Sequence, residues 1–383
     1  MEKHQNNNIE ETANQRRTVS VVIHNGRLAA EEQREEIEEI NQLTAAATLD
    51  VLATPLFKVV KPHPAHYIGA GAVETLTEVL QRFQARQVVF NCNLSVTQAR
   101  NLEKQLAMPV IDRTDLILDI FSRRAKSHEG KMQVQLAHSR RQLSRLAGFW
   151  THLERQRGGI GVRGGPGEKQ IELDRRMLAQ KISRLEAQIS KMTQRKKLAR
   201  QRRRKNGIMT AALVGYTNAG KSSLFNLLAR ENAVSDDRLF VTLDSTARRV
   251  RSADGQHFVL SDTVGFIRNL PHELVAGFRA TLADTVDSDL LLIVVDVSRH
   301  DWQEHLQLVQ EVLAEIGAEE QRRIIVYNKI DQNGQDAKIE FSECGTMQVV
   351  YMSCHTRAGL PLLQQLVATA AAKHMSLFEK PPQ

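Results

Sequence analysis

The sequence predicts an α/β protein of several domains, in which a basic helical segment separates two α/β domains. Three observations lead to this fold class. Apolar β-type runs alternate with amphipathic stretches over residues 18–112, leucine heptads occur in residues 113–205, and from residue 206 a buried strand precedes a glycine-rich loop and a helix. The chain has 383 residues, of which 42% are hydrophobic, so it can bury more than one core.

Residues 18–112 have the pattern of a small α/β domain. The runs TVSVVI, PLFKVV, RQVVFN and MPVID resemble strands, and AAEEQREEIEEINQLTAA, GAVETLTEVLQRFQ and SVTQARNLEKQLA resemble helices. This alternation predicts a mostly parallel sheet with covering helices. His63 and His66 lie in a loop rich in proline and glycine, typical of a surface turn, so we expect a binding or scaffold role. The polar leader, residues 1–17, is expected to be disordered.

Residues 113–205 predict a basic helical hairpin. Two antiparallel helices joined by the glycine-rich tip GGIGVRGGPGE are the simplest geometry. The two apolar seams with heptad spacing are Leu136, Leu143, Leu146, Trp150 and Leu153 on one helix and Leu178, Ile182, Leu185, Ile189 and Met192 on the other. Gly159, Gly161 and Gly164 match G-x-G-x-x-G, but a charged helix end precedes them and not a strand, so a dinucleotide site is not expected.

The positive charge of the chain is concentrated in this hairpin. Residues 121–205 contain 24 lysines and arginines against 6 aspartates and glutamates, whereas the rest of the chain has 28 basic and 38 acidic residues. Such a block indicates a polyanionic partner, either nucleic acid or an anionic membrane surface. The candidate RNA-binding residues are Arg155, Arg157, Arg163, Lys169, Arg202, Arg203 and Arg204.

The segment GYTNAGKSS predicts a phosphate-binding loop. It matches G-x-x-x-x-G-K-[ST] between the strand-like run MTAALV and the helix-like run SSLFNLLAR. Backbone N–H groups of such a loop turn toward the phosphates, Lys221 reaches the β and γ oxygens, and the Ser222 hydroxyl is a ligand of Mg²⁺. The expected nucleotide contacts in this loop are Gly215, Tyr216, Thr217, Asn218, Ala219, Gly220, Lys221 and Ser222.

Two downstream motifs favour GTP as the nucleotide. Asp262 ends the strand-like run of FVLSDTVGF, where it can meet Mg²⁺ through water, and the amide of Gly265 can meet the γ-phosphate; Thr263 and Val264 lie between them. In RRIIVYNKID, the Asp331 carboxylate can accept from guanine N1–H and the 2-amino group, an arrangement that adenine lacks. The full second motif is Asn328, Lys329, Ile330 and Asp331.

A further guanine-contacting loop is expected after the strand-like run MQVVYM, at Ser353, Cys354 and His355. These motifs define a P-loop GTPase domain over residues 206–375, with a tail at 376–383. Phe266 follows the first downstream motif, and an apolar side chain cannot orient the attacking water as a glutamine does. The catalytic residue is therefore unassigned, and intrinsic hydrolysis is expected to be slow.

Together these segments resemble the HflX family of translation-associated GTPases. The likeness covers nearly the whole chain, with YIGAGAVETL in the first domain, RAKSHEGKMQVQLA and GGIGVRGGPGEKQIELDRR in the helical part, and GYTNAGKSSLFN, FVTLD, DTVGFI and NKID in the last domain. The resemblance implies Thr242 as the second protein ligand of Mg²⁺, with Thr246 as its rival. The switch I residues that it implies are Phe240, Val241, Thr242, Leu243 and Asp244.

The same resemblance implies the partners. It points to GTP and GDP as ligands, to the large (50S) ribosomal subunit and its ribosomal RNA, and to ribosome splitting or rescue under stress or ribosome biogenesis as the role. Asn218 stands where it can help to hold K⁺ between the phosphates. The chain departs from the family pattern in an extra glycine in GVRGGPGE, in Lys169 and Ser245, and in having almost nothing after residue 375, where many members have a further small domain.

Composition also limits the location. Cys92, Cys344 and Cys354 have the spacing of neither a disulfide framework nor a zinc site, and neither a signal peptide nor an apolar run of membrane-spanning length is present. We therefore expect a cytoplasmic monomer without stable membrane insertion. Two other classes share the basic arm: an ATP-dependent nucleic-acid remodelling protein, which Asn328 and Asp331 oppose, and a GTPase in peripheral contact with anionic lipid. A GTP-binding switch without turnover is a third alternative.

Overall fold

The described residues form two compact units. The first comprises Met1–Arg123 with Val134–Arg184, and the second Arg124–Gln133 with Leu185–Gln383. The computed structural model describes residues 16–26, 29–156, 166–205, 207–229, 240, 246–252, 254–268, 285–319, 321–341 and 348–376. Within these ranges, no helix combines the length and the apolarity that a membrane-spanning helix requires.

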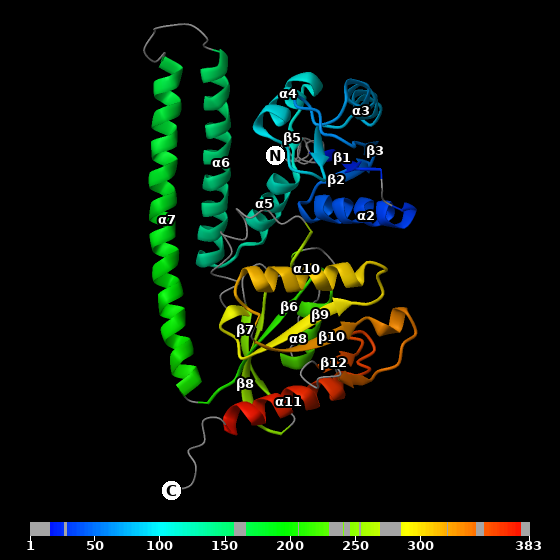
Figure 1. Ribbon diagram of the computed structural model, residues 1–383, viewed down its shortest axis with the longest axis vertical. Coiled ribbons are helices and arrows are strands. Elements are labelled where there is room, and N and C mark those ends of the chain that lie inside the picture. The colour runs from blue at the N-terminus through cyan, green and yellow to red at the C-terminus, as the bar shows by residue number, and fades with distance from the viewer. Residues whose placement is uncertain are drawn as a thin grey trace, which may run out of the picture. The chain divides into compact units, whose positions relative to one another are not determined.

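The first unit contains a parallel sheet of five described strands with helices on its faces (Figure 1). The strand order is β2-β1-β4-β5, and β3 also pairs with β1. The strands are β1 (Arg17–His24), β2 (Asp50–Ala53), β3 (Leu56–Lys58), β4 (Gln87–Phe90) and β5 (Val110–Ile111), and the helices are α2 (Ala30–Ala46), α3 (Ala70–Arg82), α4 (Val96–Leu106) and α5 (Arg113–Arg124). The predicted α/β alternation is thus present. Because β1 begins at Arg17, this residue belongs to the sheet and not to the expected leader.

The core of this sheet follows from its central strands. Val19 and Val21 of β1 and Val88 and Phe90 of β4 are all fully buried and lie in one apolar cluster, together with residues of α3 and α4. In both strands these residues are two positions apart, so they lie on one face of the sheet. Burial of a continuous apolar face is the main force that holds such a sheet against its helices.

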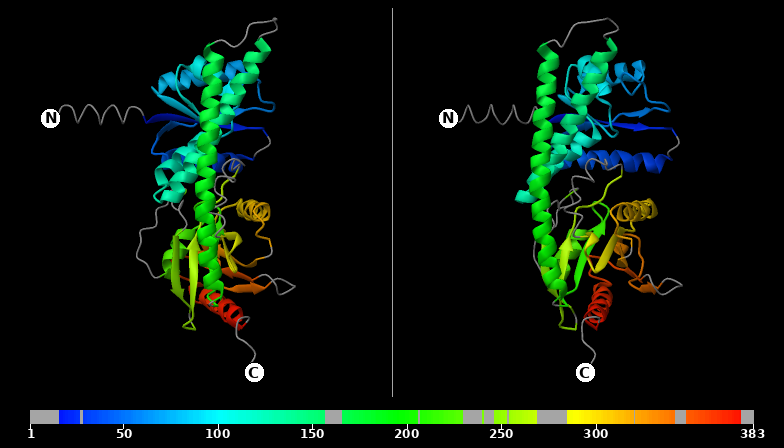
Figure 2. Two further views of the ribbon diagram at one scale, coloured as in Figure 1. Left: turned by 90° about the vertical axis from the view of Figure 1, so that its left-hand side faces the viewer. Right: turned by 60° about the vertical axis from the view of Figure 1, so that its left-hand side comes forward.

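The predicted hairpin consists of two long helices, α6 (His128–Gln156) and α7 (Pro166–Lys205), which run antiparallel (Figures 1 and 2). Leu185 is buried and Ile182 and Ile189 are half-buried, whereas most of their neighbours on α7 are exposed, as the heptad pattern predicts. Where the end of α7 lies beside the beginning of α6, Lys196 Nζ is 2.6 Å from the Glu129 carboxylate. The tip, residues 157–165, lies outside the described residues.

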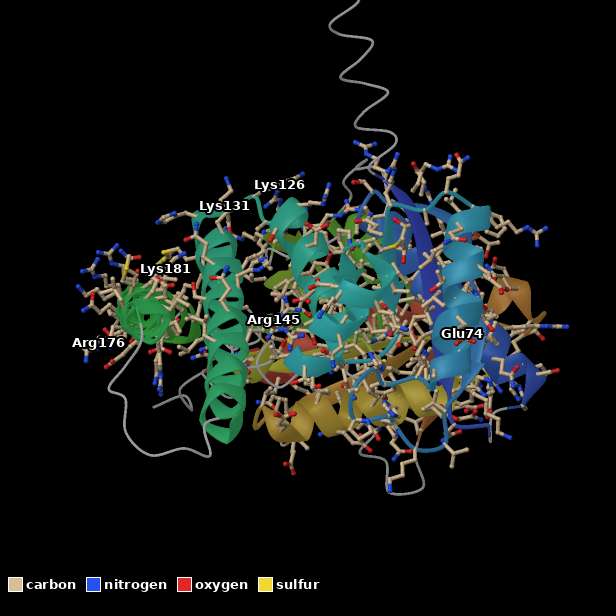
Figure 3. All side chains as sticks on the ribbon, turned by 90° about the horizontal axis from the view of Figure 1, so that it is seen from above. Glu74, Lys126, Lys131, Arg145, Arg176 and Lys181 are labelled. Atoms are coloured by element: carbon tan, nitrogen blue, oxygen red, sulfur yellow. The ribbon has the colours of Figure 1, made fainter. Side chains whose placement is uncertain are left out.

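Ion pairs join α6 to α5 in the first unit. Arg141 pairs with the buried Asp112, which precedes α5, and Arg145 pairs with Asp115 in the first turn of α5; Figure 3 labels Arg145. Burial, followed by the nearby charge of Asp115, raises the pKa of Asp112, and the Arg141 guanidinium opposes this shift. Breaking a buried pair on one side leaves an uncompensated charge, so this contact holds the middle of α6 against α5.

The second unit contains a sheet of seven described strands in the order β11-β12-β10-β9-β6-β8-β7. Only β7 and β11, at the two edges, pair antiparallel with their neighbours. The strands are β6 (Thr210–Gly215), β7 (Thr246–Arg251), β8 (His257–Asp262), β9 (Leu290–Asp296), β10 (Arg322–Asn328), β11 (Ile339–Phe341) and β12 (Gln348–Tyr351), and the helices are α8 (Lys221–Ala229), α10 (Trp302–Glu315) and α11 (Leu360–Ser376).

Alternation along the central strands gives this sheet two apolar faces. Ala211 and Leu213 of β6 belong to the cluster that includes α8 and α11, whereas Ala212 and Val214 belong to the cluster that includes α10. The view in Figure 1 accordingly places α10 and α11 on opposite sides of the sheet. β9 is buried along its whole length, so its sequence LLLIVVD is a continuous apolar run that ends in one carboxylate.

Candidate nucleotide-binding site

The predicted nucleotide motifs follow four strands of the parallel part of the second sheet. The phosphate-loop segment follows β6, Asp262 ends β8, Asn328 ends β10, and Ser353 comes shortly after β12. Because parallel strands point their carboxyl ends to one edge, these segments meet at that edge. The topology therefore brings together residues that are far apart in the chain.

The loop between β6 and α8 requires its two motif glycines. Gly215 has φ +151° and Gly220 has φ +96°. A Cβ atom at Gly215 would lie 2.2 Å from the Val294 carbonyl oxygen, and one at Gly220 would lie 2.2 Å from Asn328 Nδ2. Asn218 also has a positive φ, 61°, which asparagine tolerates better than most residues. The backbone is thus held in the conformation that a phosphate-binding loop needs.

Lys221, the first residue of α8, is buried beneath this loop. Its Nζ donates to the carbonyl oxygens of Gly215 at 3.1 Å and Tyr216 at 2.6 Å. Burial lowers the pKa of Lys221 to about 8, and the charge of Asp262 opposes the shift. An incoming phosphate supplies the negative charge that favours the protonated form of a buried lysine.

The adjacent residues fit a Mg²⁺ ion. Ser222 Oγ donates to Asp262 Oδ2 at 2.8 Å, and Asp262 is 3% exposed, so a hydroxyl and a carboxylate lie side by side at the end of β8. Oxygen ligands of these two kinds are those that Mg²⁺ prefers. Thr242 lies outside the described residues, as do Val241, Leu243 and Asp244. Thr246 opens β7, where its Cα pairs in register with that of Asp262.

The segment after Asp262 packs against the phosphate loop. The Thr263 hydroxyl donates to the Leu213 carbonyl at 2.6 Å, and a Cβ atom at Gly265 would lie 2.9 Å from both Lys221 Nζ and Thr217 Cγ2. Only glycine fits there without a shift of these atoms. Phe266 is 2% exposed and belongs to the apolar cluster beneath α10, so its side chain points into the core.

Asn328 links three loops of the site. It is 1% exposed, its Nδ2 donates to the Ala219 carbonyl at 2.9 Å, and its Oδ1 accepts from the Cys354 N–H at 3.0 Å. Lys329 follows in a left-handed conformation, φ 67°, and its Nζ lies 2.6 Å from Asp296 Oδ2. The motif thus ties the phosphate loop to the segment after β12.

The Asp331 carboxylate lies at the rim of this arrangement. Its side chain is 23% exposed, and His355 Nδ1 is 3.9 Å from Asp331 Oδ2. The Ser353 hydroxyl oxygen accepts from the N–H groups of His355 and Thr356 at 3.1 Å each, so it shapes the turn from within. Burial raises the pKa of Cys354 to about 12, which keeps it a neutral thiol. The Asp331 carboxylate thus keeps a solvent-exposed part at this rim.

Tyr216 was predicted as part of the phosphate loop, but its contacts with Arg268 and α10 were not. Tyr216 stacks on His305 of α10 with ring centroids 3.6 Å apart, and its hydroxyl oxygen accepts from the Arg268 N–H at 3.0 Å. The Arg268 guanidinium in turn donates to Asp301 at 3.0 Å and to Glu304 at 2.6 Å. These contacts tie the phosphate loop and the segment after β8 to α10. They are tertiary, and no local spacing indicates them.

The carboxylate of Asp301 is the centre of this contact. Burial alone would raise its pKa, but hydrogen bonds from His305 and Arg299, with their charges, lower it.

Asp296, the partner of Lys329, was also missed. A sequence signal existed for it, because a lone carboxylate ends the apolar run LLLIVVD.

The predicted RNA-binding residues lie where side chains are not described. They fall in residues 151–169, which include the end of α6, the tip and the start of α7, and in residues 200–205 at the end of α7. They therefore stay predictions.

Comparison with known families matches three consecutive parts of the chain. Residues 34–122 match the family described as GTP-binding GTPase N-terminal, and residues 124–203 match GTP-binding GTPase Middle Region. Residues 210–329 match the family described as 50S ribosome-binding GTPase. These matches follow the order of the small α/β domain, the hairpin and the P-loop domain.

Similar whole proteins agree with this assignment. GTPase HflX of Magnetococcus marinus is 47% identical over 331 residues, which cover 86% of this chain and 76% of that protein. GTPase HflX of Escherichia coli K12 is 44% identical over 332 residues, covering 86% and 78%. The crystal structure of SsGBP in complex with GDP, at 23% identity and TM-score 0.51, covers 93% of this chain and 99% of that one, which supports the fold. This chain therefore belongs to the HflX family of GTPases.

Proposed function

We propose that this protein binds GTP with Mg²⁺, hydrolyses it to GDP and phosphate, and does so on the large (50S) ribosomal subunit. The observation that carries the proposal is the meeting of four guanine-nucleotide motifs at one sheet edge, in a domain that matches the family described as 50S ribosome-binding GTPase. The proposed role is ribosome splitting or rescue under stress, or ribosome biogenesis.

The residues at this edge have distinct roles in the proposed reaction. Lys221 and the loop N–H groups hold the β- and γ-phosphates, and the Gly265 amide holds the γ-phosphate. Ser222 holds Mg²⁺ directly, and Asp262 holds it through water. Thr242 or Thr246 is the second protein ligand of the ion. Bound Mg²⁺ neutralises phosphate charge during the reaction.

Guanine is read at the other end of the site. The Asp331 carboxylate accepts from guanine N1–H and the 2-amino group, and Asn328 holds the three loops around the base. Adenine presents a different set of donors and acceptors, so an ionised carboxylate, which only accepts, discriminates against it.

Hydrolysis by the free protein should be slow. The side chain after Gly265 is Phe266, and it is buried in the core instead of facing the phosphates. We infer that docking on ribosomal RNA completes the site and raises turnover. Asn218, in its left-handed conformation, is the candidate for holding K⁺ between the phosphates. Equal hydrolysis rates in potassium and sodium would exclude that role.

The hairpin is the proposed contact with ribosomal RNA. Exposed basic side chains project from α7, among them Arg176 and Lys181, which Figure 3 labels. Phosphate contacts by such side chains release counterions, so binding should weaken as salt rises. In this scheme GTP sets the ribosome-bound state and hydrolysis releases a cytoplasmic, monomeric protein.

The experiment that tests the proposal is GTP turnover by the full chain, alone and with purified large subunits, at fixed potassium and moderate salt. We expect strong stimulation by large subunits. The hairpin variant is K191Q/R195Q/K197Q, and the control, with the same charge removed from the first domain, is K61Q/R86Q/K104Q. Loss of stimulation only in the hairpin variant supports the RNA contact. Intact GTP binding without stimulation would overturn the ribosomal part of the proposal, and flotation with anionic liposomes would then test the membrane alternative.

A further inference from the structure

One hydroxyl at the candidate site differs from the others. Thr217 is 6% exposed, and its Oγ1 has no hydrogen-bond partner among the described residues. By contrast, the hydroxyls of Ser222, Thr263 and Ser353 all make hydrogen bonds within the protein. Leaving a buried hydroxyl unpaired is unfavourable, so such a group in a folded protein takes a partner from a bound water or from a ligand.

The position of Thr217 indicates which part of the ligand it meets. Its backbone N–H donates to the Phe266 carbonyl at 2.8 Å, which fixes the residue against the segment after β8. A Cβ atom at Gly265 would lie 2.9 Å from both Thr217 Cγ2 and Lys221 Nζ. The Thr217 backbone and methyl group therefore lie beside Gly265 and close to Lys221 Nζ, the two groups that are proposed to hold the γ-phosphate, and the Oγ1 atom is borne by the same Cβ.

We propose that the Thr217 hydroxyl is a catalytic group that donates a hydrogen bond to a γ-phosphoryl oxygen during GTP hydrolysis. The inference rests on the proposed function, because it requires GTP turnover at this site. It adds a side-chain donor at the γ-phosphate in a chain whose Phe266 points into the core. A fixed donor in a water-poor site stabilises charge on the transferring group without reorganisation.

The chemical step needs no further reactant. The water oxygen forms a bond to the γ-phosphorus, and the bond from that phosphorus to the β–γ bridging oxygen breaks, with its electron pair remaining on GDP. One water proton stays on the inorganic phosphate and the other is released to solvent. Thr217 keeps its own proton throughout, because it acts only as a hydrogen-bond donor.

The test compares T217V with T217S in the full chain. Valine keeps the branched shape and removes the hydroxyl, whereas serine keeps the hydroxyl and removes the methyl group. The off-site control is T369V, because Thr369 is an exposed residue of α11 whose hydroxyl donates to the Gln365 carbonyl at 2.9 Å. Single-turnover GTP hydrolysis and GDP affinity are measured for each, with and without large subunits.

We expect T217V to lower the hydrolysis rate about 10- to 100-fold, the size expected for one hydrogen bond to a charged group. Its GDP affinity should change by less than about twofold, since GDP has no γ-phosphate. T217S should restore most of the rate, and T369V should match the wild type.

Three results would overturn the inference while leaving the proposed function intact. These are a wild-type rate in T217V, an equal loss in T217S and T217V, and a parallel loss of GDP affinity in T217V, which would show a role in loop structure. A wild-type protein that hydrolyses no GTP, even with large subunits, would overturn both this inference and the proposed function.

Discussion

The Cys354 backbone N–H donates to Asn328 Oδ1 at 3.0 Å, and this bond joins the end of β10 to the segment after β12. The amide of the same side chain donates to Ala219 in the phosphate loop. A single buried side chain thus satisfies one group in each of two loops. Since those loops are proposed to hold phosphate and base, Asn328 couples the two halves of the nucleotide site.

Replacing Asn328 by alanine should therefore weaken nucleotide binding and lower stability together. Two buried backbone groups would lose their partners, and each such loss costs about 1–3 kcal/mol. We expect GDP affinity to fall about 10- to 100-fold. Fluorescent-GDP titration and urea unfolding measure the two effects. The control is N333A, because Asn333 is an exposed asparagine just beyond the motif; unchanged GDP affinity in N328A would refute the coupling.

Replacing Asp331 by asparagine should change base preference without harming the fold. An asparagine amide can accept from N1–H but donates where the carboxylate accepted, which disfavours the guanine 2-amino group and suits the 2-carbonyl of xanthine. We expect a loss of GTP use and a gain of XTP use, each about 100-fold in kcat/KM. Hydrolysis assays with both nucleotides measure the exchange. If D331N keeps its GTP preference, Asp331 does not contact the base.

Nucleotide affinity should decrease in alkaline solution because of Lys221. In the free protein, burial lowers its pKa to about 8, below the ordinary 10.5. A bound phosphate favours the charged lysine and so raises that pKa. Below pH 8 the lysine is charged in both the free and the nucleotide-bound protein, so affinity does not change with pH. Above pH 8 the free protein must take up a proton when it binds the nucleotide, so affinity falls by up to about tenfold per pH unit.

Fluorescent-GDP titration between about pH 7 and 9.5 measures this effect. K221M binds more weakly but cannot titrate at this position, so its affinity should lack the step above pH 8. A step of equal size in K221M would assign the pH dependence to another group.

The strands and helices of this chain were predictable where the local pattern was strong. MTAALV, RRIIVYN and the two heptad seams correspond to β6, β10 and the hairpin helices, because burial on one face or on both leaves a periodic trace in the sequence. The motif glycines were predictable for a related reason: the backbone at Gly215 and Gly220 excludes a Cβ atom.

The sequence did not indicate the contacts between distant segments. The pairing of Lys329 with Asp296 joins β10 to β9, and the stacking of Tyr216 on His305 joins the phosphate loop to α10. Neither pair has a characteristic spacing, since both depend on the order of strands in the sheet. That the Thr217 hydroxyl lacks a partner among the described residues likewise becomes evident only when the packing around it is known.

Phe266 allows a prediction that separates core packing from catalysis. Introducing glutamine after the DTVG motif would look like the addition of a water-orienting side chain. The site of Phe266 is in the core, however, against residues of β6, β9 and α10, and is 2% exposed. F266Q should therefore lose apolar burial and bury an amide, lowering the free energy of unfolding by about 2–4 kcal/mol. F266L, which stays apolar, should lose less stability.

Urea unfolding measures the stabilities, and GTP turnover of the folded variants shows whether hydrolysis changes. Faster hydrolysis in a stable F266Q would mean that this side chain reaches the phosphates after all.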